Sequence, residues 1–356
     1  MKTSPSPVRG KNSGVAKPVF SHKLKRNLKV VLFASIGFVI LWLITRNQDV
    51  GKIWMEVRQA NYVWVLLTLL FGTLSHIARA IRWNILIAPL GETPKLSTTF
   101  YALMTGYLAN LAVPRLGEIT RCGTLARYSK IPFNGIIGTV VAERVFDMIS
   151  ILILIFLTVI FQFQFLRDFL SQYVVTPLIA LLSGNIILIG VFLIVFVAGA
   201  LMGFHYLQSV NKDKKGLPSK IKRQLLGFWK GVVSLAYIKH KIWFFFLTIV
   251  IWFFYFLTVY LIFFALPGTS FLRVSDGFTI LALGTLGVVA PVPGGVGTYH
   301  FIVITTMTEL LGVTSESATS YAYISHAAQM VLVLLVGSFS WMALSFKFKP
   351  KPVSKK

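Results

Sequence analysis

Long apolar runs dominate this sequence and limit what it can fold into. They cover about 28–45, 62–79, 135–161, 177–205, 243–266 and 318–346. Each approaches or exceeds the roughly 20 residues that an α-helix needs to cross about 30 Å of hydrocarbon. Only 13% of the residues are charged, roughly half of the fraction found in soluble domains. The sequence therefore predicts an all-α polytopic membrane protein, with each of these six runs forming a full span.

The N-terminal run is predicted to be a span and not a cleaved signal peptide. The run at 28–45 is too long for a signal core, and no small-residue cleavage site follows it. The residues before it, 1–27, are polar and basic. We therefore expect a basic cytoplasmic tail followed by a transmembrane domain over 28–346 and a second basic tail over 347–356.

Two further apolar regions are interrupted by proline and glycine. They cover about 97–130 and 278–311, and the breaks contain Pro114, Gly117, Pro291, Pro293, Gly294, Gly295 and Gly297. Proline and glycine at this density stop a helix. Irregular backbone at membrane depth is tolerated only inside protein or beside a water-filled cavity. Each region is therefore either two spans or one re-entrant hairpin.

The distribution of basic residues favours hairpins. Lysine and arginine are concentrated in 1–27, 204–241 and 347–356, and such segments are typically cytoplasmic. A single straight span at either broken region would place the 204–241 loop or the C-terminal tail outside. Two full spans apiece would also keep the parity, but half-segments of about 15 residues are short for that. We expect six full spans, two hairpins and both termini in the cytoplasm.

This layout predicts an internal repeat. The halves at about 28–161 and 177–346, joined outside, each read span, span, hairpin, span, and the two breaks resemble each other. An odd number of spans per half makes the halves inverted in the membrane. Inverted repeats with paired broken helices are typical of transporters, whose substrate site lies near the bilayer midplane.

Three ionisable residues lie inside the third long apolar run. Glu143, Arg144 and Asp147 fall within 135–161, and such groups at membrane depth usually face a protein interior or a wet cavity. One hypothesis is a cavity that meets a charged headgroup. The other is a buried ion cluster that braces the first hairpin, with Arg115, Glu118 or Arg121 as partners. Both can hold at once.

The two hairpins carry the remaining candidate site residues. In the first, Asn110, Arg115, Glu118 and Arg121 surround the break. A helix that starts after Gly117 would attract anions at its N-terminus, and the arginines could clamp a phosphate. The alternative for Arg121 is an ordinary inside-positive loop charge. In the second half, His300 follows the second break and is a candidate for the headgroup cavity. His326, in the last span, either binds a headgroup or forms hydrogen bonds between helices.

Several of these segments resemble the lysylphosphatidylglycerol synthase transmembrane family, also called flippase-like. They are GYLANLAVPRLGE at 106–118 with Arg121, ERVFD at 143–147, PVPGGVG at 291–297 and Arg82-Trp83. The resemblance implies a prokaryotic plasma-membrane protein that moves lipids between leaflets. Asn110, Arg115, Glu118, Arg121, Glu143, Arg144 and Asp147 fall on the family's motif positions. The chain departs from the family at Tyr299-His300, where a glutamate is common, and at His326, near a common arginine.

We therefore expect a lipid flippase or transporter and not an enzyme. Synthase members of the family carry a soluble aminoacyl-transfer domain, whereas this chain ends at Lys356. With one cysteine, Cys122, and no nucleotide-binding loop, we expect no metal and no cofactor. The expected partners are membrane phospholipids, anionic ones above all, and not nucleic acid. A homo-oligomer or an envelope-synthesis partner is also compatible with the sequence. The rivals are a non-transporting partner of such an enzyme and a lipid-modifying enzyme.

Overall fold

A computed structural model describes most of the helical domain. The residues that it describes are 35, 37–46, 48–91, 93–114, 116–129, 131–161, 176, 240–290 and 292–347. The predicted span at 177–205, almost all of the 204–241 loop, the tail at 1–27 and the C-terminal tail beyond Lys347 lie outside this set. All regular secondary structure in the described residues is helical.

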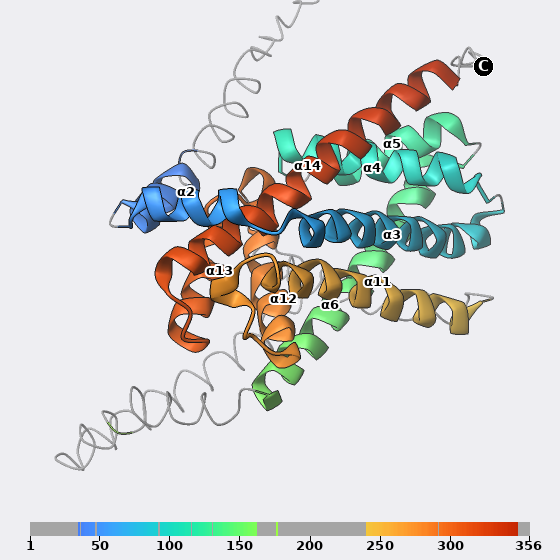
Figure 1. Cartoon of the computed structure of the whole chain (residues 1–356). Helices are drawn as coiled ribbons and strands as arrows, with labels where there is room; N and C mark the ends of the chain where they lie inside the picture. Colours follow the sequence, from blue (N-terminus) through green and yellow to red (C-terminus); the bar gives the residue numbers. More distant parts are fainter. Residues whose placement is uncertain are drawn as a thin grey trace, which may run out of the picture.

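Short connections join the successive helices within residues 50–161 and within residues 241–347 (Figure 1). Their bounds are α2 Val50–Gln59, α3 Tyr62–Ile87, α4 Leu96–Ala112, α5 Leu116–Tyr128, α6 Phe133–Phe161, α11 Lys241–Phe263, α12 Val274–Val289, α13 Thr298–Thr305 and α14 Ser315–Lys347. Residues 37–45 are also helical. A π-helical turn, Thr306–Leu310, continues α13.

Three of the described helices are long and apolar enough to cross a membrane. They cover Tyr62–Leu90, Lys241–Phe263 and Ser315–Phe346. Helix α6 is also long, with 29 residues, but it carries the three ionisable residues Glu143, Arg144 and Asp147 within its apolar run. Large apolar side chains on the outward faces are exposed, as Ile249 on α11 and Leu335 on α14 show. A helical protein with this outer surface is expected in lipid, where apolar side chains need no cover.

Both predicted breaks are present as interruptions between helices, and each one reverses the chain. In the first, α4 and α5 pack so closely that a Cβ on Gly106 would lie 2.8 Å from the carbonyl oxygen of Gly117. In the second, Thr298 Oγ1 donates to the carbonyl oxygen of Gly287 at 2.8 Å, which holds the start of α13 against α12. We call α4–α5 the first hairpin and α12–α13 the second hairpin.

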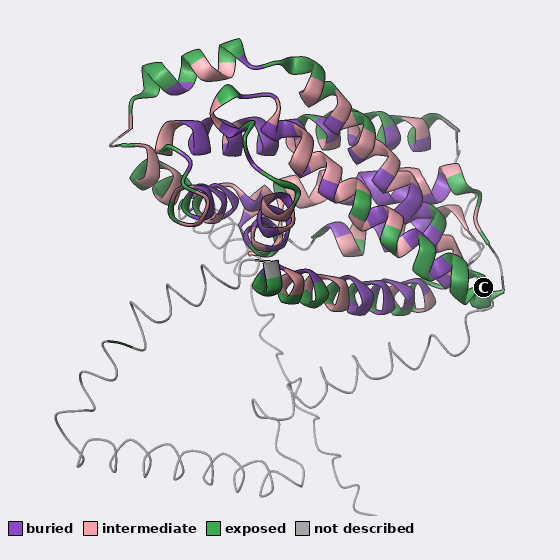
Figure 2. Ribbon diagram, turned by 60° about the horizontal axis from the view of Figure 1, so that its bottom comes forward, coloured by how far each residue is buried: buried purple, intermediate pink, exposed green. Residues whose placement is uncertain are grey.

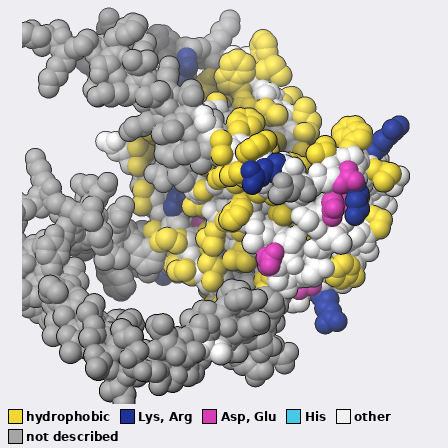
Figure 3. Space-filling view, turned by 90° about the vertical axis from the view of Figure 1, so that its left-hand side faces the viewer, with side chains coloured by type: hydrophobic (Ala, Val, Ile, Leu, Met, Phe, Trp, Pro, Cys, Tyr) yellow, Lys and Arg dark blue, Asp and Glu magenta, His cyan; other side chains and the backbone are white. Residues whose placement is uncertain are grey.

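The two hairpins attach at opposite ends of the α3–α11 pair. These helices run antiparallel, because Asn61 before α3 donates its backbone N–H to Ala265 after α11 at 2.9 Å. The first hairpin follows the end of α3, and the second follows the end of α11. Helix α2 lies at the second hairpin's end, where Ser317 at the start of α14 donates to Glu56. Figure 3 shows this end, with charged side chains of both signs among hydrophobic ones.

The helix pairings have a regular pattern. Helix α3 packs on α11. Helix α4 packs on α14, and in the same way α12 packs on α6. Helix α3 also packs on α4, and in the same way α11 packs on α12. In addition, α5 packs on α6, as α13 packs on α14. Exchanging α3 with α11, the first hairpin with the second and α6 with α14 leaves these pairings unchanged. The packing of α14 on α3 breaks the pattern, because α6 and α11 are not packed in the same way in the described residues.

The interior has two main apolar clusters, and Figure 2 shows the buried residues along the inward faces of the helices. One cluster lies between α11, α12, α13 and α14 and includes Phe263 and Tyr321. The other lies between α3, α4, α5 and α6 and includes Trp83 and Leu125. Each hairpin is therefore anchored in its own apolar cluster, and the space between the two hairpins is left for the site.

Candidate functional site

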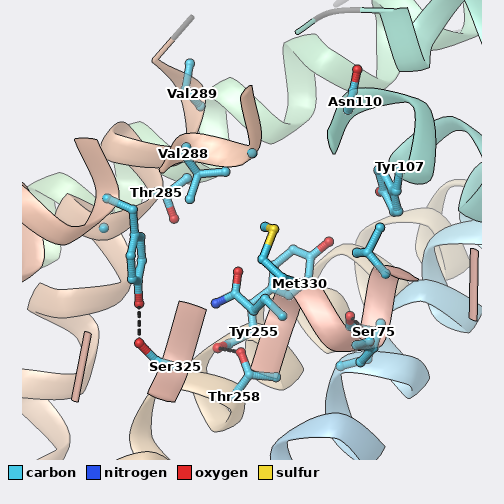
Figure 4. A pocket seen from close by; sticks show the side chains of 18 of the residues that line it. Ser75, Tyr107, Asn110, Tyr255, Thr258, Thr285, Val288, Val289, Ser325 and Met330 are labelled. Atoms are coloured by element: carbon cyan, nitrogen blue, oxygen red, sulfur yellow. Dashed lines mark hydrogen bonds between the residues drawn. The ribbon is translucent and has the colours of Figure 1, made fainter. Parts of the chain in front are cut away.

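A cavity of about 550 Å³ lies between the two hairpins. Both breaks line it, with Pro114 from the first and Val292, Gly294 and Gly295 from the second. The other walls come from α3, α6, α11 and α14 (Figure 4). Its size falls in the range of about 300–1,000 Å³ that is usual for ligand sites. The two interruptions predicted from proline and glycine thus meet at one cavity.

A buried ion cluster forms one end of this cavity. Glu143 accepts from Arg79 Nε at 2.6 Å and lies 3.0 Å from Arg121 Nη1. Asp147 accepts from Arg82 Nη2 at 2.7 Å and also from Arg79. All five side chains are buried. The cluster joins α3, α5 and α6. This is the arrangement expected for a buried ion cluster that braces the first hairpin.

The predicted site residues did not include two of these arginines, Arg79 and Arg82. They are three positions apart on α3 and therefore share a helix face. The apolar run predicted a span that ends at 79, whereas α3 continues to Ile87 with both arginines buried. The sequence signal for these two residues is a pair of arginines at helical spacing next to an apolar run. The same pattern is typical of a helix end on the cytoplasmic side of a membrane, where basic residues are enriched.

Arg144 and Glu118 form the accessible part of the cluster. Arg144 Nη2 donates to Glu118 Oε1 at 2.8 Å, and the two side chains are 43% and 32% exposed. Arg144 Nη1 also lies 3.6 Å from Asp147. Both Arg144 and Glu118 line the cavity. This ion pair links the first hairpin to α6 and is the charged surface that a ligand would meet.

Arg121 does not line the cavity in this structure. It is 1% exposed, and its guanidinium lies 4.9 Å from the ring centre of Trp83 while facing Glu143. The phosphate-clamp hypothesis therefore finds Arg121 inside the cluster, and the arginines that line the cavity in the described part of the chain are Arg79 and Arg144. Arg115, the third arginine considered, lies outside the described residues.

Asn110 stabilises the first break. Its Oδ1 accepts the backbone N–H of Gly117 at 2.6 Å, and the residue also lines the cavity. An asparagine oxygen of this kind caps one of the N–H groups that a helix leaves unpaired at its start. The N-terminus of α5, which was expected to attract an anion, thus has one of its N–H groups already bonded within the chain.

The two histidines stabilise the second break. His326 Nε2 lies 2.9 Å from the carbonyl oxygen of Gly294, so this nitrogen carries the proton. His300 Nδ1 accepts the backbone N–H of Gly297 at 3.4 Å. The two rings are 4.7 Å apart, and neither histidine lines the cavity. Pro291 lies outside the described residues. Of the two hypotheses for His326, the geometry matches hydrogen bonding between segments, and His300 lies outside the cavity wall where it was expected.

Uncharged polar groups cover most of the remaining polar wall. Tyr107 and Thr285 line the cavity, and so does Tyr255, whose hydroxyl accepts from Arg79 Nη1 at 2.9 Å (Figure 4). Tyr299, also in the wall, shares a hydrogen bond of 2.9 Å with Ser325. Within the described part of the chain, no three His, Cys, Asp or Glu side chains are grouped so that they could hold a metal ion.

One protein-family model matches most of the chain. The model of the lysylphosphatidylglycerol synthase TM region matches residues 28–337. The chain belongs to this family. It is also 25% identical over 292 residues to a UPF0104 membrane protein of Methanothermobacter thermautotrophicus, a match that covers 78% of this chain and 84% of the relative. No solved structure matches.

Membership in this family agrees with the helices that could span a membrane, and the protein is an integral membrane protein. The resemblance read from the sequence is therefore confirmed at the family level, without a soluble domain in the matched region. The matched part of this chain contains both hairpins and the whole ion cluster, since residues 79–147 and 274–305 lie within the match.

Proposed function

We propose that this protein is a flippase or transporter that moves an anionic or amino-modified phospholipid, or a related envelope lipid, between leaflets. The observation that supports it best is the cavity shared by both hairpin breaks, with the Arg144–Glu118 pair in its wall. Broken helices that meet around a cavity at their breaks are typical of transporter sites. The family of the chain supports the same class of function.

The proposal includes an arrangement in the membrane. We place six full spans and two re-entrant hairpins in the plasma membrane of a prokaryote, with both termini in the cytoplasm. Attachment of the hairpins at opposite ends of the α3–α11 pair supports their entry from opposite leaflets. The exchange pattern of the helix pairings supports an inverted repeat. Alternating access would follow if one half rocked against the other around the cavity.

In this proposal the headgroup enters the cavity while the acyl chains stay in the bilayer. Arg144 is the accessible arginine and would meet the phosphate, while Glu118 and Asp147 hold it in place. The buried Arg79–Glu143 contact keeps α3 and α6 together as the headgroup passes. The chain would act on lipid position alone and break no bond.

Lipid scrambling in proteoliposomes tests the proposal. Acyl-labelled fluorescent phosphatidylglycerol is quenched by dithionite in the outer leaflet only, so a moving lipid raises the quenched fraction above that of empty liposomes. We expect native protein to raise it and Arg144→Gln to reduce the rate roughly tenfold or more, because one charge-assisted contact to the phosphate is lost. The matched control is Arg127→Gln, an exposed arginine of α5 outside the cavity wall.

If folded native protein matches empty liposomes for every lipid offered, the transport proposal is wrong. The non-transporting partner of an envelope-synthesis enzyme would then be the better account. In that case Arg144→Gln would change stability or partner binding and leave the lipid distribution as it is. Appearance of a chemically altered lipid would instead indicate the lipid-modifying enzyme.

A further inference from the structure

Helix α2 crosses the start of α14 at the end of the bundle where the second hairpin attaches. Three side chains spaced four residues apart contact the first turn of α14: Gln48, Lys52 and Glu56, whose partners are Ser315, Glu316 and Ser317 at 2.9, 3.8 and 2.9 Å. These contacts extend over roughly two turns on the α2 side and over a single turn of α14. Helix α2 therefore lies across the end of this spanning helix and not along it.

One face of α2 packs on the protein. Ile53, Val57 and Ala60 are four and three positions apart, so they share this face. Ile53 and Ala60 are 6% and 7% exposed, and Val57 packs against the apolar cluster of α11, α12, α13 and α14. The inward direction of the helix is thus fixed by its own residues.

The apolar face of α2 is wider than the part that the protein covers. Val50 and Trp54 lie three positions before Ile53 and Val57, so they form a neighbouring strip on the helix surface. They are 66% and 67% exposed. We call this pair the overhanging strip. The side of the helix away from it carries exposed polar residues: Lys52, Arg58 and Gln59.

The overhanging strip continues into a surface that faces lipid. Tyr62, the first residue of α3, donates its hydroxyl to the carbonyl oxygen of Val57 at 2.8 Å. From there Tyr62, Val63 and Leu66 form an exposed apolar surface on α3, which is long and apolar enough to cross a membrane. Tryptophan and tyrosine are enriched where a bilayer meets water, and Trp54 and Tyr62 are both exposed at this end. Figure 3 shows the same end, with hydrophobic side chains beside charged ones.

We infer that α2 is an interfacial helix that binds the lipid surface of the leaflet at this end. Val50 and Trp54 insert at the boundary between headgroups and acyl chains, while Lys52 and Arg58 stay at the level of phosphates and water. An amphipathic helix with this division of its surface lies in the plane of a bilayer interface. Helix α2 does not line the cavity between the hairpins, so this anchor is separate from the proposed lipid movement.

The contacts with α14 give the anchor a structural consequence. Because Lys52 and Glu56 bind the first turn of α14, insertion of α2 fixes that turn at the depth of the headgroups. Helix α14 follows the second hairpin in the chain. The end of the bundle that carries this hairpin is therefore held to its leaflet by lipid as well as by protein contacts.

A fluorescent label on α2 in proteoliposomes tests this inference. The one native cysteine, Cys122, is buried, so Val50→Cys supplies the accessible thiol for an environment-sensitive label and keeps Trp54. We expect strong quenching by a lipid with a doxyl group near the headgroup end of its acyl chain. Quenching by aqueous iodide or by a doxyl group at the chain end should be weaker. Gln59→Cys, on the exposed polar side of the same helix, is the matched control and should be quenched mainly by iodide.

Two neighbouring substitutions separate insertion from general surface hydrophobicity. Trp54 and Met55 are both large, apolar and exposed, but Met55 is two positions from the buried Ile53 and therefore lies on the opposite side of the helix. In the protein labelled at Val50→Cys, Trp54→Gln should raise iodide quenching roughly threefold, because less apolar area holds the helix in the boundary. Met55→Gln should leave iodide quenching unchanged. An unfolding temperature near native in both variants shows that the fold is intact.

Each other outcome overturns the inference. Equal iodide quenching at positions 50 and 59 would place α2 in water. Stronger quenching by the doxyl group at the chain end would place α2 in the hydrocarbon. A label at 50 that neither iodide nor lipid quenches would show that a second copy of the chain covers the strip, since no other protein is present. The readout does not use lipid movement, so failure of the proposed transport function leaves this test unaffected.

Discussion

Arg79 Nε on α3 donates a hydrogen bond to Glu143 Oε1 on α6 at 2.6 Å, and both side chains of this ion pair are almost fully buried. The residues are 64 positions apart in the sequence. Glu143 also faces Arg121 on the first hairpin, so a single carboxylate holds α3, α5 and α6 together. The accessible Arg144–Glu118 pair is built on this buried frame.

Replacing Glu143 should therefore destabilise the fold. Glu143→Gln leaves Arg79 and Arg121 without their shared carboxylate, and breaking a buried pair on one side costs about 3–5 kcal/mol. We expect a large drop in the thermal unfolding temperature in detergent, together with a lower yield of folded protein.

Glu118 provides the comparison for Glu143. Glu118→Gln breaks a pair whose side chains are 32% and 43% exposed, and such pairs contribute about 0–1 kcal/mol. The unfolding temperature of Glu118→Gln should stay close to that of the native protein, while its rate of lipid scrambling changes. Equal loss of stability in both variants would contradict the division into a buried frame and an accessible pair.

His326 should matter through its bond to the second break. His326→Phe removes the donor to the carbonyl oxygen of Gly294, and an unpaired buried carbonyl costs about 1–3 kcal/mol. His326→Gln keeps a donor and should restore part of that stability. The exposed His240→Phe, before α11, should have no comparable effect on the unfolding temperature. If Phe and Gln at 326 behave alike, the hydrogen bond is not what the histidine supplies.

The sequence predicted the framework of the fold because proline, glycine and long apolar runs act locally. The breaks at 113–117 and 290–297 appear as interruptions between helices, and both are followed by a reversal of the chain. The end of α3 was predicted poorly, at 79 and not at Ile87. The hydropathy of a single segment does not reveal that its arginines will be neutralised by carboxylates from another helix.

The candidate site was predicted in part, for the same reason. Glu143, Arg144 and Asp147 stand out because charges are rare within apolar runs. Their partners Arg79 and Arg82 are separated from them by more than 60 positions, and no short-range pattern identifies such a pairing. The roles of His300 and His326 depend on the course of the second break, which only the three-dimensional structure provides.

Gly297 should tolerate no side chain. Its φ is +84°, a conformation that L-residues rarely adopt, and an added Cβ would collide with the backbone of Gly37. Gly297→Ala should lower the free energy of unfolding by at least about 1–2 kcal/mol from backbone strain alone. The control is Gly138→Ala in α6, where a Cβ meets no atom within 4 Å. This control should be neutral or stabilise by about 0.5–1 kcal/mol, and the reverse order would show that the second break is built differently.

Filling the cavity should stop lipid movement without unfolding the protein. Thr285 lies in the cavity wall on α12 and is shown beside the open space in Figure 4. Thr285→Phe places an aromatic ring where the headgroup would pass and leaves the buried ion cluster untouched. We expect scrambling of phosphatidylglycerol to fall at least roughly tenfold, with a thermal unfolding temperature near native.

Thr305→Phe is the matched control for this variant. Thr305 lies on the second hairpin but is exposed and outside the cavity wall. The same aromatic side chain there should leave the scrambling rate unchanged, because it meets lipid and not the headgroup path. If Thr285→Phe folds and scrambles as the native protein does, lipid does not pass through this cavity. The Arg144–Glu118 pair would then lie off the transport path, and its ion pair would be explained by stability alone.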